Sequence, residues 1–180
     1  MFGALRRLFI PTPPTAVEET YIALVAAARN PFFFTTLAVP DTIDGRFDMI
    51  VLHLFLLQHR LVGGSAASAE TRAFAQYLSE AFFTDMDRSL RELGVADTGV
   101  SQRIKKMGKA YHGRLQAYAA ALTDATLLRA ALARNVYGTV AEGDVGVLDQ
   151  LAQYMQQVAA TLATTETATI TAGRFVWPAV

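Results

Sequence analysis

The sequence predicts an all-α fold, a compact single-domain bundle of about six helices around a buried central helix at about residues 41–61. Apolar residues recur every three or four positions along most of the chain, which is the period of a helix with one packed side. The sequence contains neither a β-hairpin signal nor an internal repeat. Its 180 residues are 52% hydrophobic and 18% charged, so one core can form without metal or disulfide cross-links.

Residues 1–14 are expected to lie outside the helical domain. Two arginines occur here, but three prolines follow them in place of the apolar region of an export signal, so no such signal is predicted. The segment is either a short amphipathic tether to a membrane surface or a first turn that is frayed or docked. The apolar and basic residues of the tether would be Phe2, Leu5, Leu8, Phe9, Ile10, Arg6 and Arg7.

The first helix is expected from Thr15 to about Asn30. Thr15 and Glu18 have the spacing of a capping box, and a proline directly after the helix ends it. Three consecutive phenylalanines then follow at positions 32–34. Their side chains must point in different directions, so they either fill gaps between helices or leave one ring exposed.

The central helix is distinguished by two apolar stripes on opposite sides of its axis. A surface helix needs only one such stripe, so two stripes indicate a helix that is packed on both sides. The first stripe consists of Phe47, Ile50, Leu54, Leu57 and Leu61, and the second of Met49, Leu52 and Leu56. Gly63 and Gly64 are expected to end this helix.

Four further helices are expected at about 69–93, 100–122, 123–135 and 144–164, because each range has an apolar stripe at helical spacing. After them the threonine-rich sequence has weak helix propensity, and Phe175 and Trp177 are expected to anchor the end of the chain. We therefore divide the chain into an N-terminal segment (1–14), an all-α domain (15–165) and a C-terminal tail (166–180).

Charged residues on two of these helices share a spacing of seven positions. Arg46, His53 and Arg60 follow this spacing on the central helix, and Asp85 and Glu92 follow it on the next long helix. We predict that these side chains pair across the contact as a structural charge ladder. Such pairs would fix the register of the two helices, because loss of one partner leaves a buried charge unpaired.

The helix expected at about 100–122 has a basic face without acidic residues. A run of like charges is often simply a solvated face. The alternative is a docking surface for ribosomal RNA or for anionic lipid headgroups. The residues of this face are Arg103, Lys105, Lys106, Lys109, His112 and Arg114.

No motif predicts catalysis, so we expect no catalytic residue, no metal and no cofactor. The absence of cysteine excludes disulfides, thiolate zinc sites and cysteine nucleophiles. Zero net charge gives no reason to expect DNA as a partner. One enzyme hypothesis remains, in which aspartates of two helices hold Mg²⁺ ions on a prenyl diphosphate, although negative charge at a helix start is favourable without any metal. Those residues are Asp41, Asp44, Asp48, Asp85 and Asp87.

Several segments between about residues 31 and 122 resemble the ubiquinol–cytochrome c chaperone family. They are Asp44-Gly45-Arg46-Phe47-Asp48-Met49 with His53, Phe83-Thr84-Asp85-Met86-Asp87-Arg88, Leu90-Arg91-Glu92-Leu93-Gly94-Val95, Lys105-Lys106-Met107, and Tyr111-His112-Gly113-Arg114 with Tyr118. The resemblance implies a non-enzymatic assembly factor that binds newly made cytochrome b. Its mitochondrial members also work with a small helper protein and associate with the ribosome. Without a transit peptide, this chain is similar to a bacterial form, expected in the cytoplasm or peripherally at the inner membrane.

A chaperone of that kind needs a groove with aromatic and flexible apolar walls for its client. The side chains that could supply it are also candidates for the core. They are Phe32, Phe33, Phe34, Phe82, Phe83, Met86 and Met107. The alternatives are a protein that binds a small apolar ligand (lipid, quinone or haem) in a closed pocket, and the Mg²⁺-dependent enzyme.

Overall fold

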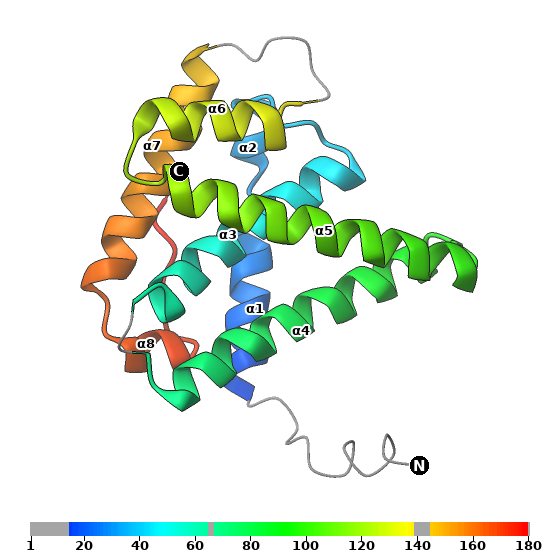
Figure 1. Cartoon of the computed structure of the whole chain (residues 1–180), viewed down its shortest axis with the longest axis horizontal. Coiled ribbons are helices and arrows are strands. Elements are labelled where there is room, and N and C mark those ends of the chain that lie inside the picture. The colour runs from blue at the N-terminus through cyan, green and yellow to red at the C-terminus, as the bar shows by residue number, and fades with distance from the viewer. Residues whose placement is uncertain (1–14, 65–66, 139–144, 180) are drawn as a thin grey trace.

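The computed structural model describes residues 15–64, 67–138 and 145–179 (Figure 1). Within these ranges it contains eight helices and no strand, which confirms the all-α prediction. The bounds are α1 (Thr15–Ala28), α2 (Pro31–Thr35), α3 (Ile43–Val62), α4 (Ala69–Glu92), α5 (Asp97–Ala121), α6 (Ala125–Asn135), α7 (Val145–Thr164) and α8 (Thr167–Thr171). The six long helices are the predicted ones, and α2 and α8 add five residues each. The tether hypothesis for residues 1–14 lies outside the described residues.

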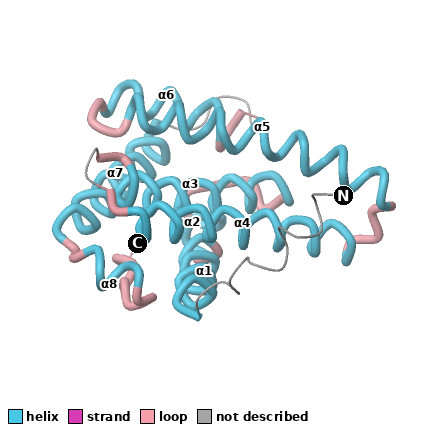
Figure 2. Tube along the Cα trace, turned by 60° about the horizontal axis from the view of Figure 1, so that its bottom comes forward, coloured by secondary structure: helices cyan, strands magenta, loops and turns pink. Residues whose placement is uncertain are grey.

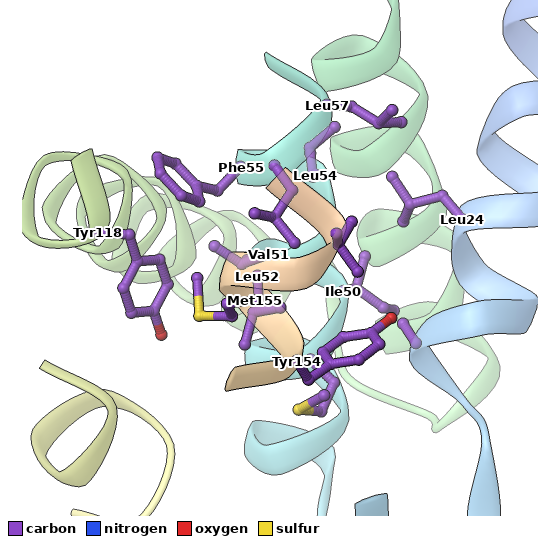
Figure 3. Packing of buried hydrophobic residues seen from close by; sticks show 14 of the residues in the cluster. Leu24, Ile50, Val51, Leu52, Leu54, Phe55, Leu57, Tyr118, Tyr154 and Met155 are labelled. Carbon is purple, nitrogen blue, oxygen red and sulfur yellow. The ribbon is translucent and has the colours of Figure 1, made fainter. Parts of the chain in front are cut away.

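Helix α3 forms the centre of the molecule. Helices α1, α4, α5 and α7 all pack against it, as the two apolar stripes predicted. In Figure 2, α5 and α6 run along one side of the molecule, and α1 and α8 lie on the opposite side. Figure 3 shows α3 side chains meeting Leu24 of α1, Tyr118 of α5 and Met155 of α7. None of the helices in the described ranges combines the length and apolar character needed to cross a bilayer.

Local sequence explains where α3 begins. The Thr42 side chain accepts a hydrogen bond from the Gly45 amide at 3.1 Å, which satisfies one of the free N–H groups at the start of the helix. Gly45 is also required sterically, because a Cβ atom there would lie 1.9 Å from the Pro40 carbonyl oxygen. The chain before α3 therefore folds tightly over the first turn of the central helix.

The end of the chain packs back on the core. Arg60 of α3 donates hydrogen bonds to the carbonyl oxygens of Leu162 at 2.7 Å and Thr165 at 2.8 Å. These carbonyls lie at the C-terminus of α7, where a cation is favourable. Beyond α8, Phe175 is buried and the Trp177 ring lies 4.9 Å from the His53 ring.

Candidate functional site

Two of the segments that carry the family resemblance meet in space. The first turns of α3 and the middle of α5 face each other across a hollow of about 390 Å³, which the end of α6 closes. Its walls combine apolar groups with charged ones. The lining residues are Pro40, Asp44, Gly45, Phe47, Asp48, Lys106, Met107, Ala110, Arg114, Arg134, Asn135, Val136 and Gly138. We call this the α3–α5 hollow.

A buried ion pair lies in the wall of the α3–α5 hollow. Nη2 of Arg114 is 2.7 Å from Oδ1 of Asp48, and the two side chains are only 18% and 6% exposed. The same Nη2 donates a hydrogen bond to the Asn135 carbonyl at 3.2 Å, and the guanidinium lies 5.4 Å from the centre of the Phe47 ring. Arg114 therefore connects α5 to α3 and to the end of α6.

Burial has the largest effect on the pKa of the Asp48 carboxyl group. Loss of solvent raises the pKa of this carboxyl to about 7, against the opposing effect of the Arg114 charge. Among the described residues, Oδ1 of Asp48, Nε of Arg114 and the Tyr118 hydroxyl are buried without a hydrogen-bond partner. Asp48 and Arg114 line the hollow, so part of its inner wall is polar.

Five of the six residues proposed for the basic docking face of α5 lie at the surface, and the docking role itself stays a prediction. Arg103, Lys105, Lys106, Lys109 and His112 are all exposed. Arg114 differs, because its side chain turns inward to Asp48 and is only 18% exposed, so it is not part of the exposed face. Including Arg114 in the docking face was wrong, and the deciding fact was the position of a buried acid on another helix.

The predicted charge ladder between α3 and α4 does not form. Arg46 pairs with Asp41 at 2.6 Å, and Arg60 is bonded to the end of α7. Asp85 accepts a hydrogen bond from the Tyr21 hydroxyl at 3.0 Å and pairs with Arg88 of its own helix. The other acidic member of the proposed ladder, Glu92, lies 4.0 Å from that same arginine. Equal spacing along two helices did not determine how the helices are rotated toward each other.

His53, the third basic member of the proposed ladder, is fully buried and neutral. Burial lowers its pKa to about 4, because the charged form would be removed from water. One ring nitrogen, Nδ1, lies 2.7 Å from the Met49 carbonyl, which can only accept, so Nδ1 carries the proton. Nε2 therefore accepts from the Tyr154 hydroxyl at 2.7 Å. His53 joins α3 to α7 rather than to α4.

Gln58 supplies the polar link between α3 and α4 that the ladder was expected to provide. Its amide nitrogen donates to the Ala75 carbonyl at 3.2 Å and to the Ser79 hydroxyl at 2.6 Å. Its amide oxygen accepts from the Tyr111 hydroxyl of α5 at 2.7 Å. Gln58 was not predicted as a linking residue, and its one signal was an uncharged polar residue directly after the apolar run Leu54-Phe55-Leu56-Leu57.

The aromatic and methionine residues proposed to bind a client do not form one groove. Phe33, Phe82 and Met86 are buried in the core, so they cannot contact another molecule in this conformation. Phe33 packs against the His53 and Tyr154 rings, with centroid distances of 5.6 and 5.1 Å. The remaining members, Phe32, Phe34, Phe83 and Met107, are partly buried against the same core. Of the seven, Met107 lines the α3–α5 hollow.

A second and larger hollow lies between α1 and α4, with a volume of about 830 Å³. We call it the α1–α4 groove. One face of each helix lines it, since the contributing positions recur at intervals of three and four residues. They are Glu18, Tyr21, Ile22, Val25 and Ala26 from α1, Arg29 directly after it, and Glu80, Ala81, Thr84, Asp85, Arg88, Ser89 and Glu92 from α4. Charged residues rim both hollows, which does not favour a closed pocket for a small apolar ligand.

Four of the five aspartates of the enzyme hypothesis have separate partners, and Asp41 is the one already described with Arg46. Asp48 pairs with an arginine of α5, and Asp85 with a tyrosine of α1 and an arginine of α4. Asp87 pairs with Arg91 at 2.6 Å. Among the described residues, no group of three or more acidic or histidine side chains is arranged to hold a metal ion. The premise of facing carboxylate clusters is therefore wrong.

Comparison with known proteins gives a consistent result. A family model described as ubiquinol-cytochrome C chaperone matches residues 35–177. The crystal structure of the Cbp3 homolog from Brucella abortus is similar to this chain, with 36% sequence identity and a TM-score of 0.82. The similarity covers 99% of this chain and 97% of that chain. No curated protein matches.

Proposed function

The chain belongs to the ubiquinol-cytochrome c chaperone family, and we propose that it is a non-enzymatic assembly factor that binds newly made cytochrome b. The observation that supports this most strongly is the extent of the family match, which includes all of α3 to α8. Similarity to the Cbp3 homolog along nearly the whole of both chains supports the same role. The proposal places the protein in the cytoplasm or peripherally at the inner membrane.

The client is tested by recovering the tagged chain from cells that make cytochrome b and from a strain in which cytochrome b is deleted. We expect cytochrome b to be recovered with the chain from the first strain. A small helper protein, if one exists here as in mitochondrial relatives, would be recovered alongside it. If cytochrome b is absent from the material while other membrane proteins are enriched, the client assignment is wrong and the family membership is unaffected.

The basic face of α5 is proposed to dock the chaperone where its client emerges, on the ribosome or on an anionic membrane. Both surfaces are polyanionic, so binding should weaken as salt rises. The double variant Lys105→Glu with Lys109→Glu reverses two exposed charges on this face. The matched variant Arg72→Glu with Arg174→Glu reverses two exposed charges outside α5.

Co-sedimentation with ribosomes, and separately with vesicles containing anionic lipid, identifies the surface that is bound. We expect the α5 variant to lose at least tenfold in association with one of them and the matched variant to retain it. Equal loss in both variants would indicate a general charge effect. Unchanged association of the α5 variant with both surfaces would refute a docking role for this face.

A further inference from the structure

We propose that the α1–α4 groove is the client-binding surface, and that it takes the end of an apolar helix followed by lysine or arginine residues. The inference rests on the proposed function, since it assumes that the client is a membrane protein. It replaces the dispersed aromatic set, whose central members are buried in the core.

The shape of the groove fits a helix. Its walls run from Glu18 on α1 to Arg29 directly after it, and from Glu80 to Glu92 on α4. At 1.5 Å per residue these stretches are roughly 17 Å long, or about three helical turns. Helices α1 and α4 cross steeply (Figures 1 and 2), so the space between them is an open corner that suits the end of a helical segment rather than its whole length.

The centre of the groove offers apolar contact. Ile22 is 60% exposed although it lies within a helix beside the groove. Val25 and Ala81 are half-buried and flank the same space, and Ala26 leaves room on the α1 side. Together these four side chains form a contiguous apolar patch in a concave surface, where another apolar side chain could be covered.

The rim of the groove is acidic. Glu18, Glu80, Asp85 and Glu92 line it, against Arg29 and Arg88, which leaves an excess of two negative charges. Asp85 is held in place by the Tyr21 hydroxyl at 3.0 Å, and its side chain remains 12% exposed. An acidic rim favours a cationic partner and disfavours an anionic one. This charge is opposite to that of the exposed face of α5, so the two surfaces suit different partners.

Membrane proteins have segments with this combination of properties. The ends of their transmembrane helices that face the cytoplasm are enriched in lysine and arginine, while the helices themselves are apolar. A groove of three turns is shorter than the roughly 20 residues that span a bilayer, so it would cover one end of such a helix. We infer that the chaperone shields the end that carries the positive charges.

Direct binding is measured with the full chain and two synthetic fluorescent peptides. Each consists of a 12-residue helix of leucine and alanine, followed by three lysines in one peptide and three glutamates in the other. By fluorescence polarisation we expect the lysine peptide to bind and the glutamate peptide to bind at least tenfold more weakly. Failure of the lysine peptide to bind, or equal affinity for both peptides, would overturn the proposal.

Substitutions in the α1–α4 groove test whether the lysine peptide binds there. Ile22→Asp places a charge in the groove, and Ala26→Trp fills part of its space. Each variant should therefore bind the lysine peptide at least tenfold more weakly than the unaltered chain. Leu127→Asp is the matched control, because Leu127 is 53% exposed on α6, which does not line the groove. Thermal melting confirms that each variant is folded. If both groove variants are folded and bind as tightly as the control, the peptide binds elsewhere and the inference is wrong.

Two other occupants have distinct outcomes. If reversing Arg6 and Arg7 to glutamate tightens peptide binding, the N-terminal segment of this chain competes for the groove and is its resident occupant. If the chain is a dimer that Ile22→Asp dissociates, a second copy occupies the groove. The dimer overturns the assignment to the client, whereas competition by the N-terminal segment supports the groove as the site from which the client displaces that segment.

The same variants separate this inference from the proposed function. If the unaltered chain recovers no cytochrome b from cells, the proposed function fails first. If it recovers cytochrome b and Ile22→Asp recovers it equally well, the function stands and the groove assignment fails.

Discussion

Two buried ionisable groups of α3, Asp48 and His53, are predicted to give opposite dependences of stability on pH. The pKa of the Asp48 carboxyl rises from 3.8 to about 7 on folding, chiefly because it is buried. The pKa of the His53 imidazole falls from 6.5 to about 4 for the same reason. In both cases the folded protein favours the neutral form.

The sign of each pH dependence follows from whether the folded or the unfolded state holds the proton. Between pH 3.8 and 7 the folded protein keeps a proton on Asp48 that the unfolded chain has released, so rising pH lowers the free energy of unfolding. Between pH 4 and 6.5 the unfolded chain holds a proton on His53 that the folded protein lacks, so rising pH increases that free energy. At 1.36 kcal/mol per pKa unit the changes are about 4 and about 3 kcal/mol. They nearly cancel in the unaltered protein.

Single variants should therefore reveal slopes that the unaltered protein conceals. In Asp48→Asn we expect stability to increase by about 3 kcal/mol between pH 4 and 6.5, relative to the unaltered protein. In His53→Gln the His53 contribution is removed, so relative to the unaltered protein we expect stability to decrease by about 3 kcal/mol between pH 4 and 6.5. Both variants also lose stability at every pH, because each leaves a buried partner unsatisfied.

Urea unfolding at a series of pH values measures these slopes. The single tryptophan, Trp177, lies 4.9 Å from the His53 ring, so its fluorescence reports on this part of the core. Subtracting the curve of the unaltered protein removes the contributions of groups common to both. If both difference curves are flat within about 1 kcal/mol, neither group titrates as its burial requires and the reasoning is refuted.

Three further predictions concern stability alone. Gly45→Ala should lower the free energy of unfolding by at least about 2 kcal/mol, because the added Cβ would collide with the backbone. Gly113→Ala, which lies in open space within α5, should raise it by roughly 0.5–1 kcal/mol. Chemical denaturation of both variants measures the two changes. Arg60→Ala should lower the stability by about 2 kcal/mol, because it leaves carbonyl groups at the end of α7 without their donor. Arg46→Ala breaks an exposed ion pair and should lower the stability by less than about 1 kcal/mol. Equal losses in thermal melts would contradict this. Tyr21→Phe removes the hydroxyl that donates to a carboxylate of α4 and should cost roughly 1–3 kcal/mol, measured by urea unfolding; no loss would mean that water replaces the bond.

The long helices could be predicted because their signals are local. Capping residues and glycines mark where they start and end, and the apolar period shows which side is packed. Thr42 and Ser68 each accept a hydrogen bond from the third residue after them, which places the starts of α3 and α4. The two apolar stripes of the central helix likewise required two packed sides before any neighbour was known. Spacing within one segment carries all of this information.

Polar partners depended on tertiary structure. Arg114 and Lys109 both belong to the basic side of α5 in the sequence, yet one faces a buried carboxylate and the other faces water. His53 and Asp85 were expected to lie in one contact and instead join α3 to α7 and α4 to α1. To predict which of these partners a side chain meets, one must know how each helix is rotated about its axis. That rotation depends on the packing of many side chains at once.

The sequence by itself determined that the chain is a helical domain organised around a central helix, predicted at about 41–61 and found at Ile43–Val62, and it contained the segments that resemble its family. Only the tertiary structure decided which aromatic residues are buried in the core and which two helices leave a groove between them. The physical reason is that burial is a property of several elements at once. Helical period fixes the neighbours of a residue along its own helix, whereas access to a partner depends on what the remaining helices cover.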